Sequence, residues 1–285
     1  MSHHNAKKDE WSGKNIDLRT SDRTQYLAAP SAGKGILAEY ERLIDTARQG
    51  KESFDAVVFG ATPELRDMVL DRGGNLTTVD FSAESFEKCG AAMEHVGDPR
   101  EHIKVESWLE TTCGDASADI VLGDGIFNNI PFDSYERLFG QIHRILRPDG
   151  FFILREGVLP SDRPTRTVEE ISAEFDREGM HWFDLIMDLR FFSDISTRTF
   201  AGGAYIYSFM SLYEAIDAAH ECRRLADAAF QAVSRFRNSV SHTFAPRTVF
   251  EEIFNRFFES LPVSQASDYK FCADTFIFFF GNKNG

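Results

Sequence analysis

Cysteine is scarce in this sequence of 285 residues, and the four that occur lie far apart: Cys89, Cys113, Cys222 and Cys272. They form no CxxC pair and no cluster with histidine. This spacing argues against a zinc site and against a disulfide framework, so we expect free thiols in a reducing compartment.

Long apolar segments and excess positive charge are also missing. The polar start of the sequence has no apolar stretch typical of a signal peptide, and the most apolar run near either end, residues 275–280, is too short to cross a bilayer. The 31 lysines and arginines are outnumbered by 45 acidic residues, which gives a net charge of −14. Such a chain is repelled by nucleic-acid phosphates and by anionic membrane surfaces. We therefore expect a cytoplasmic protein that binds neither nucleic acid nor membrane.

Two nucleotide-binding motifs are absent as well. Residues 30–35 (Pro-Ser-Ala-Gly-Lys-Gly) look like part of a phosphate-binding loop, but glycine stands where serine or threonine should follow the lysine, and no strand precedes them. We interpret them as the turn before a helix over 36–44. The sequence also lacks G-x-G-x-x-G, which argues against a dinucleotide-dependent oxidoreductase.

The strongest positive signal is a strand, a turn and a helix in the first quarter of the sequence. Residues 56–59 are a short apolar run typical of a buried parallel strand, and Gly60 ends it. Thr62 and Pro63 are residue types that begin a helix, which we expect over 64–70.

A second strand, expected over 76–79, ends in Asp80, twenty residues beyond Gly60. Strand, tight turn, helix, strand and terminal acid form a unit that binds adenosine-type cofactors, because N–H groups of the turn approach the ligand and the acid accepts hydrogen bonds from ribose hydroxyls. The alternative is that Asp80 only caps the next helix. Its distance from Gly60 favours the cofactor interpretation.

Further helices are expected over 82–93 and 135–146, with strands over 103–106, 119–122 and 151–154. Strands that alternate with helices predict a doubly wound parallel sheet. Right-handed crossovers bring the carboxyl ends of all its strands to one edge, where ligands bind. Residues that follow the strand ends should gather there: Gly60, Asp80, Ser107, Asp124 and Arg155.

The alternation is lost between residues 159 and 243. Residues 168–189 and 205–236 have helical patterns, with a polar and aromatic connector between them. This insertion leaves the sheet at the edge that binds ligands. We expect it to be either a substrate cap or a contact in a homodimer, because its apolar helices need a surface to pack against.

The pattern of the sheet returns after the insertion. A helix is expected over 246–261, and strands over 267–272 and 275–280. Too few residues separate these two strands for a crossover helix, so they must pair as an antiparallel hairpin.

Together these motifs resemble the class I S-adenosylmethionine-dependent methyltransferases. The resemblance covers about residues 35–158 and 245–285 and implies an α/β, Rossmann-like methyltransferase fold: a mostly parallel seven-stranded sheet with a terminal antiparallel hairpin and a helical insertion after strand five. The matching segments are the glycine-rich first motif at 57–66, the second strand at 76–82, the adenine-lining segment at 106–109, the fourth-strand motif at 120–125 and the entry to strand five at 144–151. The implied division is an N-terminal segment or lid (1–54), a cofactor-binding core (55–158), a substrate cap (159–243) and a C-terminal part that completes the core (244–285).

The resemblance also implies which residues bind the cofactor, S-adenosylmethionine. They are Tyr26, Gly60, Ala61, Thr62, Pro63, Asp80, Phe81, Ser107, Trp108, Asp124, Gly125 and Phe127. Tyr26 is included because the residues before strand one often fold over the pocket in this fold. Trp108 could instead be core packing, and Asp124 could be only a turn former.

The first motif departs from the family pattern. The acid that usually stands two residues before the first glycine is Val58, and later glycines are replaced by Ala61 and Pro63. A less permissive turn must therefore approach the methionine end of the cofactor. Arg66 could hold the cofactor carboxylate, or it could be an ordinary surface residue of its helix.

The acceptor-binding candidates are Asn128, Arg155, Phe209 and Tyr213. Asn128 could equally cap a helix. Among the histidines, His143 fits a structural role, whereas His181, His220 and His242 could each act as a base, and nothing in the sequence singles one out. No catalytic residue is assigned.

The expected reaction is methyl transfer to a small-molecule or peptide acceptor in a biosynthetic tailoring step. Methyl transfer is a direct displacement at carbon, for which the enzyme mainly aligns the acceptor and excludes water, so the absence of a catalytic triad or metal cluster fits it. Two alternatives remain: a non-catalytic S-adenosylmethionine-binding protein, suggested by the altered first motif, and a dinucleotide-dependent oxidoreductase.

Overall fold

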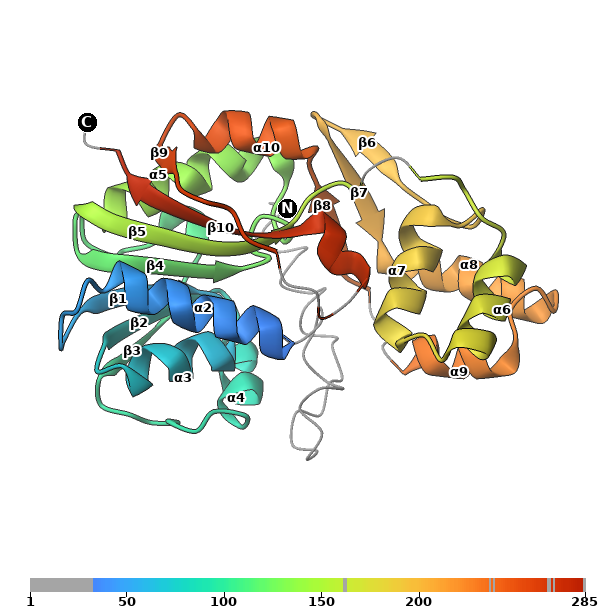
Figure 1. Cartoon of the computed structure of the whole chain (residues 1–285), viewed down its shortest axis with the longest axis horizontal. Coiled ribbons are helices and arrows are strands. Elements are labelled where there is room, and N and C mark those ends of the chain that lie inside the picture. The colour runs from blue at the N-terminus through green and yellow to red at the C-terminus, as the bar shows by residue number, and fades with distance from the viewer. Residues whose placement is uncertain are drawn as a thin grey trace.

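The computed structural model describes residues 33–160, 163–235, 237, 239–265, 268 and 270–283. A seven-stranded sheet in the order β3-β2-β1-β4-β5-β10-β9 forms its centre (Figure 1). The parallel strands are β1 (Asp55–Phe59), β2 (Asn75–Asp80), β3 (Glu101–Val105), β4 (Ala118–Asp124) and β5 (Leu146–Gly157). β10 (Thr275–Asn282) runs antiparallel to β5 on one side and to β9 (Phe258–Ser260) on the other. The predicted mostly parallel α/β sheet with a terminal antiparallel strand pair is confirmed.

Helices cover the two faces of this sheet, and successive residues of each central strand point to opposite faces. Val57 packs with one core cluster and Val58 with the other, as the period of two in a strand requires. The first face is covered by α5 (Tyr135–Ile145) and α10 (Arg247–Phe254), the second by α2 (Lys34–Ala47), α3 (Pro63–Asp71) and α4 (Ala83–Gly90). The central strands are buried on both sides, which explains their continuous apolar runs.

The connection from β3 to β4 differs from the other connections of the parallel strands. Residues 106–117 contain a short 3₁₀ turn, η2 (Trp108–Glu110), and no α-helix. The face of β1, β2 and β3 on the side of α5 therefore lacks a helix of its own.

The insertion after β5 contains helices and also a second sheet. The predicted helical pattern is confirmed by α6 (Val168–Glu178), α7 (Trp182–Phe192), α8 (Phe209–Glu221) and α9 (Asp227–Ser234). The expectation of helix from residue 205 onward is wrong at its start, because β7 (Ala204–Ser208) pairs with β6 (Thr199–Ala201) and with β8 (Ser241–Phe244). Pairing between β7 and β8 joins residues far apart in the sequence, and a local pattern gives no sign of it.

The C-terminal part differs from the prediction in its boundaries. α10 ends at Phe254 rather than at residue 261, and residues 270–272 of the strand predicted over 267–272 do not form a strand. Its place is taken by a 3₁₀ turn, η4 (Lys270–Asp274), while β9 at Phe258–Ser260 pairs with β10. Phe258 explains this arrangement, because its fully buried ring packs against Phe280 of β10 at a centroid distance of 5.9 Å.

Within the described residues, no helix is long and apolar enough to cross a membrane. All four cysteines are free, as predicted.

Candidate functional site

The turn after β1 lies at the strand-end edge of the sheet. Gly60 has φ = +98°, and its N–H donates to the carbonyl of Val79 at 2.9 Å. Among the described residues, the atom nearest to a Cβ placed on Gly60 would be the Thr62 hydroxyl oxygen, at 3.8 Å. The left-handed backbone, rather than crowding, therefore requires glycine here. Thr62 and Pro63 then begin α3 as predicted, although the Thr62 hydroxyl makes no capping hydrogen bond.

Asp80 is a buried acid at the neighbouring strand end. Its side chain accepts hydrogen bonds from the backbone N–H groups of Ser82 (2.9 Å), Phe81 and Ala61, so it holds the turn after β1 as well as its own. No lysine or arginine in the described part of the chain lies within ion-pair distance of it. Burial without a cation raises the pKa of Asp80 to about 6, although the three N–H groups act in the opposite direction.

Trp108 lies beneath the Gly60 turn. Its indole N–H donates to the carbonyl of Val79 at 2.8 Å, and the nearest ring atom lies 3.9 Å from the position of a Gly60 Cβ. Phe81 meets it edge to face at a centroid distance of 6.3 Å. The ring belongs to the hydrophobic core and at the same time forms the floor under the turn, so both interpretations of Trp108 hold in part. Ser107 caps the 3₁₀ turn η2 by accepting a hydrogen bond from the N–H of Leu109 at 3.2 Å.

Asp124 and Arg155 form an ion pair at the ends of β4 and β5. The guanidinium donates from Nε to Asp124 Oδ1 at 2.6 Å and from Nη2 to Oδ2 at 2.8 Å. Tyr40 of α2 bridges the same two strands, because its hydroxyl donates to the carbonyl of Gly123 at 2.6 Å and accepts from the N–H of Arg155 at 2.8 Å. Gly125, which has a positive φ, donates its N–H to the carbonyl of Arg155 at 2.8 Å. The edge predicted from the strand ends is thus a connected structure.

Glu156 is a polar residue of this edge that the sequence did not assign. Its carboxylate is almost completely buried and accepts hydrogen bonds from the N–H groups of Phe127 (3.1 Å) and Asn128 (2.9 Å). Burial raises its pKa well above the usual range. The only signal in the sequence was an acid at a strand end, next to Arg155. Its contacts fix the loop after β4.

The side chains of Phe127 and Asn128 are already used inside the protein. The Phe127 ring is fully buried and stacks on Phe139, so only its backbone could face a ligand. The Asn128 amide donates to the carbonyls of Gly157 and Thr243, both at 2.8 Å. We therefore leave both side chains out of the candidate site. Asn128 instead joins the loop after β4 to the end of β5 and to β8 of the insertion.

Phe209 and Tyr213 lie inside the insertion rather than on a surface toward the strand ends. Both are buried in its hydrophobic cluster, and the Tyr213 hydroxyl donates to the carbonyl of Val233 at 3.0 Å. The helical spacing identified them as apolar, but it could not tell which surface they face.

Arg66 and Tyr26 complete the predicted cofactor candidates. Arg66 is neither a surface residue nor near the strand-end edge. It is buried and forms two hydrogen bonds, of 2.7 and 2.9 Å, with Glu101 at the start of β3. Tyr26 lies outside the described residues.

The histidines do not converge on the strand ends. His143 packs beside Phe257 and lies 3.2 Å from the carbonyl of Lys283, in agreement with a structural role. His181 caps α7, and His220 pairs with Asp227 at 2.9 Å. His242 accepts a hydrogen bond at Nδ1 from Arg190, which places its proton on Nε2 and leaves no free lone pair for a base.

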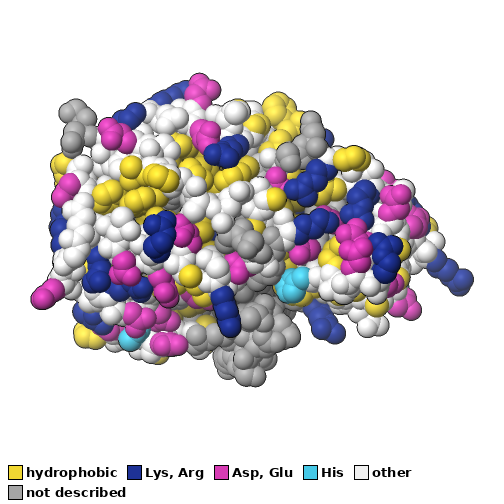
Figure 2. Space-filling model, viewed as in Figure 1, with side chains coloured by type: hydrophobic (Ala, Val, Ile, Leu, Met, Phe, Trp, Pro, Cys, Tyr) yellow, Lys and Arg dark blue, Asp and Glu magenta, His cyan; other side chains and the backbone are white. Residues whose placement is uncertain are grey.

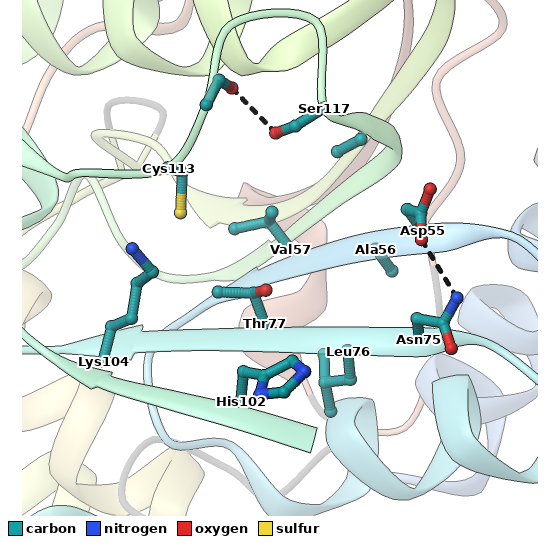
Figure 3. Close-up of a pocket in the computed structure, with 12 residues that line it drawn as sticks. Asp55, Ala56, Val57, Asn75, Leu76, Thr77, His102, Lys104, Cys113 and Ser117 are labelled. Atoms are coloured by element: carbon teal, nitrogen blue, oxygen red, sulfur yellow. Dashed lines mark hydrogen bonds between the residues drawn. The ribbon is translucent and has the colours of Figure 1, made fainter. Parts of the chain in front are cut away.

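A hollow of about 390 Å³ lies elsewhere, on the bare face of β1 to β3 (Figure 3). Val57, Thr77 and His102 point into it, and Asn75 bonds Asp55 at 3.1 Å at one end. These residues come from the amino-terminal and middle parts of the strands. The hollow is therefore separate from the edge formed by Gly60 and Asp80.

The insertion touches the strand-end edge through the turn between β6 and β7. A Cβ on Gly203 would lie 2.8 Å from the ring of Phe132, which follows β4. Ala204 is fully buried in the core cluster of the sheet. With the bonds of Asn128 to Gly157 and Thr243, these contacts fix the insertion next to the loop after β4.

Comparison with known proteins agrees with this arrangement. Residues 59–154 match the methyltransferase domain family. No curated protein matches the chain in sequence.

Solved methyltransferase structures share the fold at low sequence identity. A structure of 1,6-didemethyltoxoflavin-N1-methyltransferase from Burkholderia thailandensis, with bound 1,6-didemethyltoxoflavin and S-adenosylhomocysteine, is 16% identical, covers 88% of this chain and 80% of its own, and has a TM-score of 0.50. A putative S-adenosylmethionine-dependent methyltransferase from Listeria monocytogenes is 10% identical over 88% of this chain and 100% of its own, with a TM-score of 0.55. The N-methyltransferase NodS from Bradyrhizobium japonicum, in complex with S-adenosylhomocysteine, is 8% identical over 98% of each chain, with a TM-score of 0.50.

The strand-end edge has the chemistry that an adenosine cofactor needs. Asp80 is a buried acceptor that forms no ion pair within the described residues, and the left-handed Gly60 turn lies beside it. Residues 59–154 carry a methyltransferase domain, and the chain has the fold of solved S-adenosylmethionine-dependent methyltransferases.

Proposed function

We propose that this methyltransferase modifies a small-molecule or peptide acceptor held between the strand-end edge and the insertion. The observation that carries the proposal is the contact of the β6–β7 turn with Phe132, because it fixes the insertion beside the loop after β4. A cap in that position encloses the acceptor and excludes water, which a displacement at carbon requires.

Different residues of the edge would contact different parts of the cofactor. Asp80 would accept hydrogen bonds from the ribose hydroxyls, and the backbone at Gly60, Ala61 and Thr62 would face the methionine end. Phe81, Ser107 and Trp108 would line the adenine. When bound, S-adenosylmethionine supplies a methyl group activated by a positively charged sulfur.

The Asp124–Arg155 pair would order the mouth of the site rather than carry out proton transfer. Because each charge is already neutralised by the other, the pair keeps both strand ends at a fixed spacing. Gly125 and the loop fixed by Glu156 follow directly from it. A rigid loop at this point would orient the acceptor toward the methyl group.

The net negative charge of the chain supports a small acceptor over a nucleic acid. On the face in Figure 2, acidic and basic side chains are interspersed over both the sheet domain and the insertion. With a net charge of −14, this distribution offers little attraction to a phosphate backbone. We propose that the modification of such an acceptor is a biosynthetic tailoring step in the cytoplasm.

The test combines binding with turnover. Calorimetric titration should detect S-adenosylmethionine and S-adenosylhomocysteine but not NAD or NADP. Formation of S-adenosylhomocysteine should then be followed while pools of small metabolites, peptides and RNA are offered as acceptors. Turnover with RNA alone would contradict the acceptor class. Tight cofactor binding without turnover on any pool would instead favour a non-catalytic protein.

A further inference from the structure

Arg190 of α7 is a buried cation that forms no ion pair within the described part of the chain. Only 2% of its surface is exposed, and no aspartate or glutamate of the described residues lies within ion-pair distance. Buried charges in proteins are normally paired, because an isolated one is costly to remove from water. Burial lowers the pKa of Arg190 to about 9, which reflects this cost.

Aromatic rings surround the guanidinium. Its central carbon lies 4.2 Å from the ring centroid of Phe209, and between 5.2 and 5.5 Å from those of Phe191, Tyr207 and Phe244. Such contacts compensate a cation in part. The aromatic rings contact the flat faces of the guanidinium, so a ligand can reach only its N–H edges.

On one of those edges, only one of the two nitrogen atoms forms hydrogen bonds. Nη2 donates to the carbonyl of Tyr207 and to Nδ1 of His242, both at 3.1 Å, whereas Nε is buried and has no hydrogen-bond partner. A neutral imidazole offers a single acceptor atom. A carboxylate offers two oxygens in a plane, which matches the paired donors of a guanidinium edge.

The site lies next to the strand-end edge. The ring of Phe244 is one of the four around Arg190, and its nearest atom would lie 3.1 Å from a Cβ on Gly157, the last residue of β5. One aromatic ring thus separates the guanidinium from the end of that strand. His242, which is only half-buried, covers the edge of the guanidinium and gives a route to it.

We propose that Arg190 recognises the carboxylate of an acidic methyl acceptor, and that His242 occupies the carboxylate position until the acceptor arrives. This assignment rests on the proposed function of the insertion as the acceptor cap. It adds that the acceptor is a small organic acid, with its carboxylate against α7 and β8.

Benzoate is the probe, compared with uncharged benzamide and with phosphate at equal ionic strength. Thermal unfolding is recorded with the protein saturated by S-adenosylhomocysteine. Benzoate should raise the melting temperature in a saturable way, because a ligand that binds only the folded state stabilises it. Benzamide should have no such effect. A response to phosphate equal to that of benzoate, or none to benzoate, would overturn the proposal.

Three variants assign the effect to a residue. Arg190→Met should weaken benzoate binding at least tenfold, and His242→Ala should strengthen it, because the competing imidazole is gone. Arg237→Met is the matched control: Arg237 lies in the same insertion and over Tyr213, but it is paired with Asp217. Equal benzoate binding in wild type and Arg190→Met would show that Arg190 is purely structural.

A measurement on the wild-type protein covers the case in which Arg190→Met does not fold. The Nε–H resonance of Arg190 in ¹⁵N-labelled protein should shift on addition of benzoate, and an unchanged resonance contradicts the proposal. Loss of the response to S-adenosylhomocysteine itself would instead count against the proposed function. The two failures are therefore distinguishable.

Discussion

The guanidinium of Arg155 and the carboxylate of Asp124 form a two-point ion pair, with bonds of 2.6 and 2.8 Å, across the ends of two adjacent strands. Both side chains are largely buried, at 6% and 15% exposure. A pair in this position is sensitive to the loss of one partner, because the remaining buried charge loses its two-point ion pair.

Asp124→Ala should therefore destabilise the fold by roughly 3–5 kcal/mol, the usual cost of breaking a buried pair. Urea unfolding measures the change. Glu110→Ala is the control, since its pair with Arg137 is exposed and should contribute little. Equal, small changes for both variants would mean that the buried pair is not important for stability.

Asp80→Ala should weaken cofactor binding while the protein stays folded. The loss of a charged acceptor from a buried site corresponds to roughly 1.5–3 kcal/mol, or about tenfold to more than a hundredfold in affinity. Calorimetric titration with S-adenosylmethionine gives the value. Asp71→Ala, at an exposed surface pair with His95, should bind as the wild type does. Unchanged affinity in a folded Asp80→Ala variant would remove Asp80 from the site.

The affinity for S-adenosylmethionine should also fall as the pH drops through about 6. The pKa of Asp80 is raised to about 6, and only its ionised form can accept both ribose hydroxyls. Titrations between pH 5 and 8 test this. Asp80→Asn, which has no proton to bind at this position, should show a much flatter profile.

The contribution of Asp80 to folding stability without cofactor has the opposite pH dependence. Between the ordinary aspartate pKa near 4 and the raised value, the folded state binds a proton that the unfolded chain has released. The stabilisation from Asp80 is thus largest at low pH and is lost as the pH rises through about 6. The difference in unfolding free energy between wild type and Asp80→Asn should follow that trend, and a constant difference would contradict the raised pKa.

Gly203→Ala should impair use of the acceptor without affecting the cofactor. Its Cβ would lie 2.8 Å from the ring of Phe132, so the β6–β7 turn or that ring must shift. We expect a higher KM or a lower kcat for the acceptor and the same affinity for S-adenosylhomocysteine. Gly202→Ala is the neighbouring control, because its Cβ would have an ordinary 3.9 Å contact with Phe132 and its φ of 66° strains alanine less than the 113° of Gly203. If the insertion is instead a dimer contact, light scattering should show a change of mass in Gly203→Ala with normal acceptor kinetics.

The first half of the fold could be predicted because its signals are local. Apolar runs, helix starts and strand-end acids recur within short windows, so Gly60, Asp80 and the parallel sheet followed from the sequence and the topology rules. Partners far away in the chain could not be inferred. Asn128 bonds Thr243, and β7 pairs with β8, through contacts that leave no periodic trace.

In the candidate site, too, local features could be predicted and long-range contacts could not. Phe209 and Tyr213 were correctly recognised as apolar positions, but their pattern is identical whether a helix faces a ligand or its own core. Glu156 and Arg190 were missed as functional candidates because their importance comes from burial and from missing partners. Those properties exist only in three dimensions.

The position of β10 has a consequence for the way the protein is made. Residues 275–281 complete the sheet by pairing with residues 151–157 of β5, and the rings of Phe278 and Phe280 pack against Phe250 and Phe254. On the ribosome, β5 emerges first and must wait for the entire insertion before its second neighbour exists. An open, apolar strand edge invites pairing with other chains during that interval. A fragment that stops after β5 would contain the whole matched domain, residues 59–154, and still aggregate for want of its last strand.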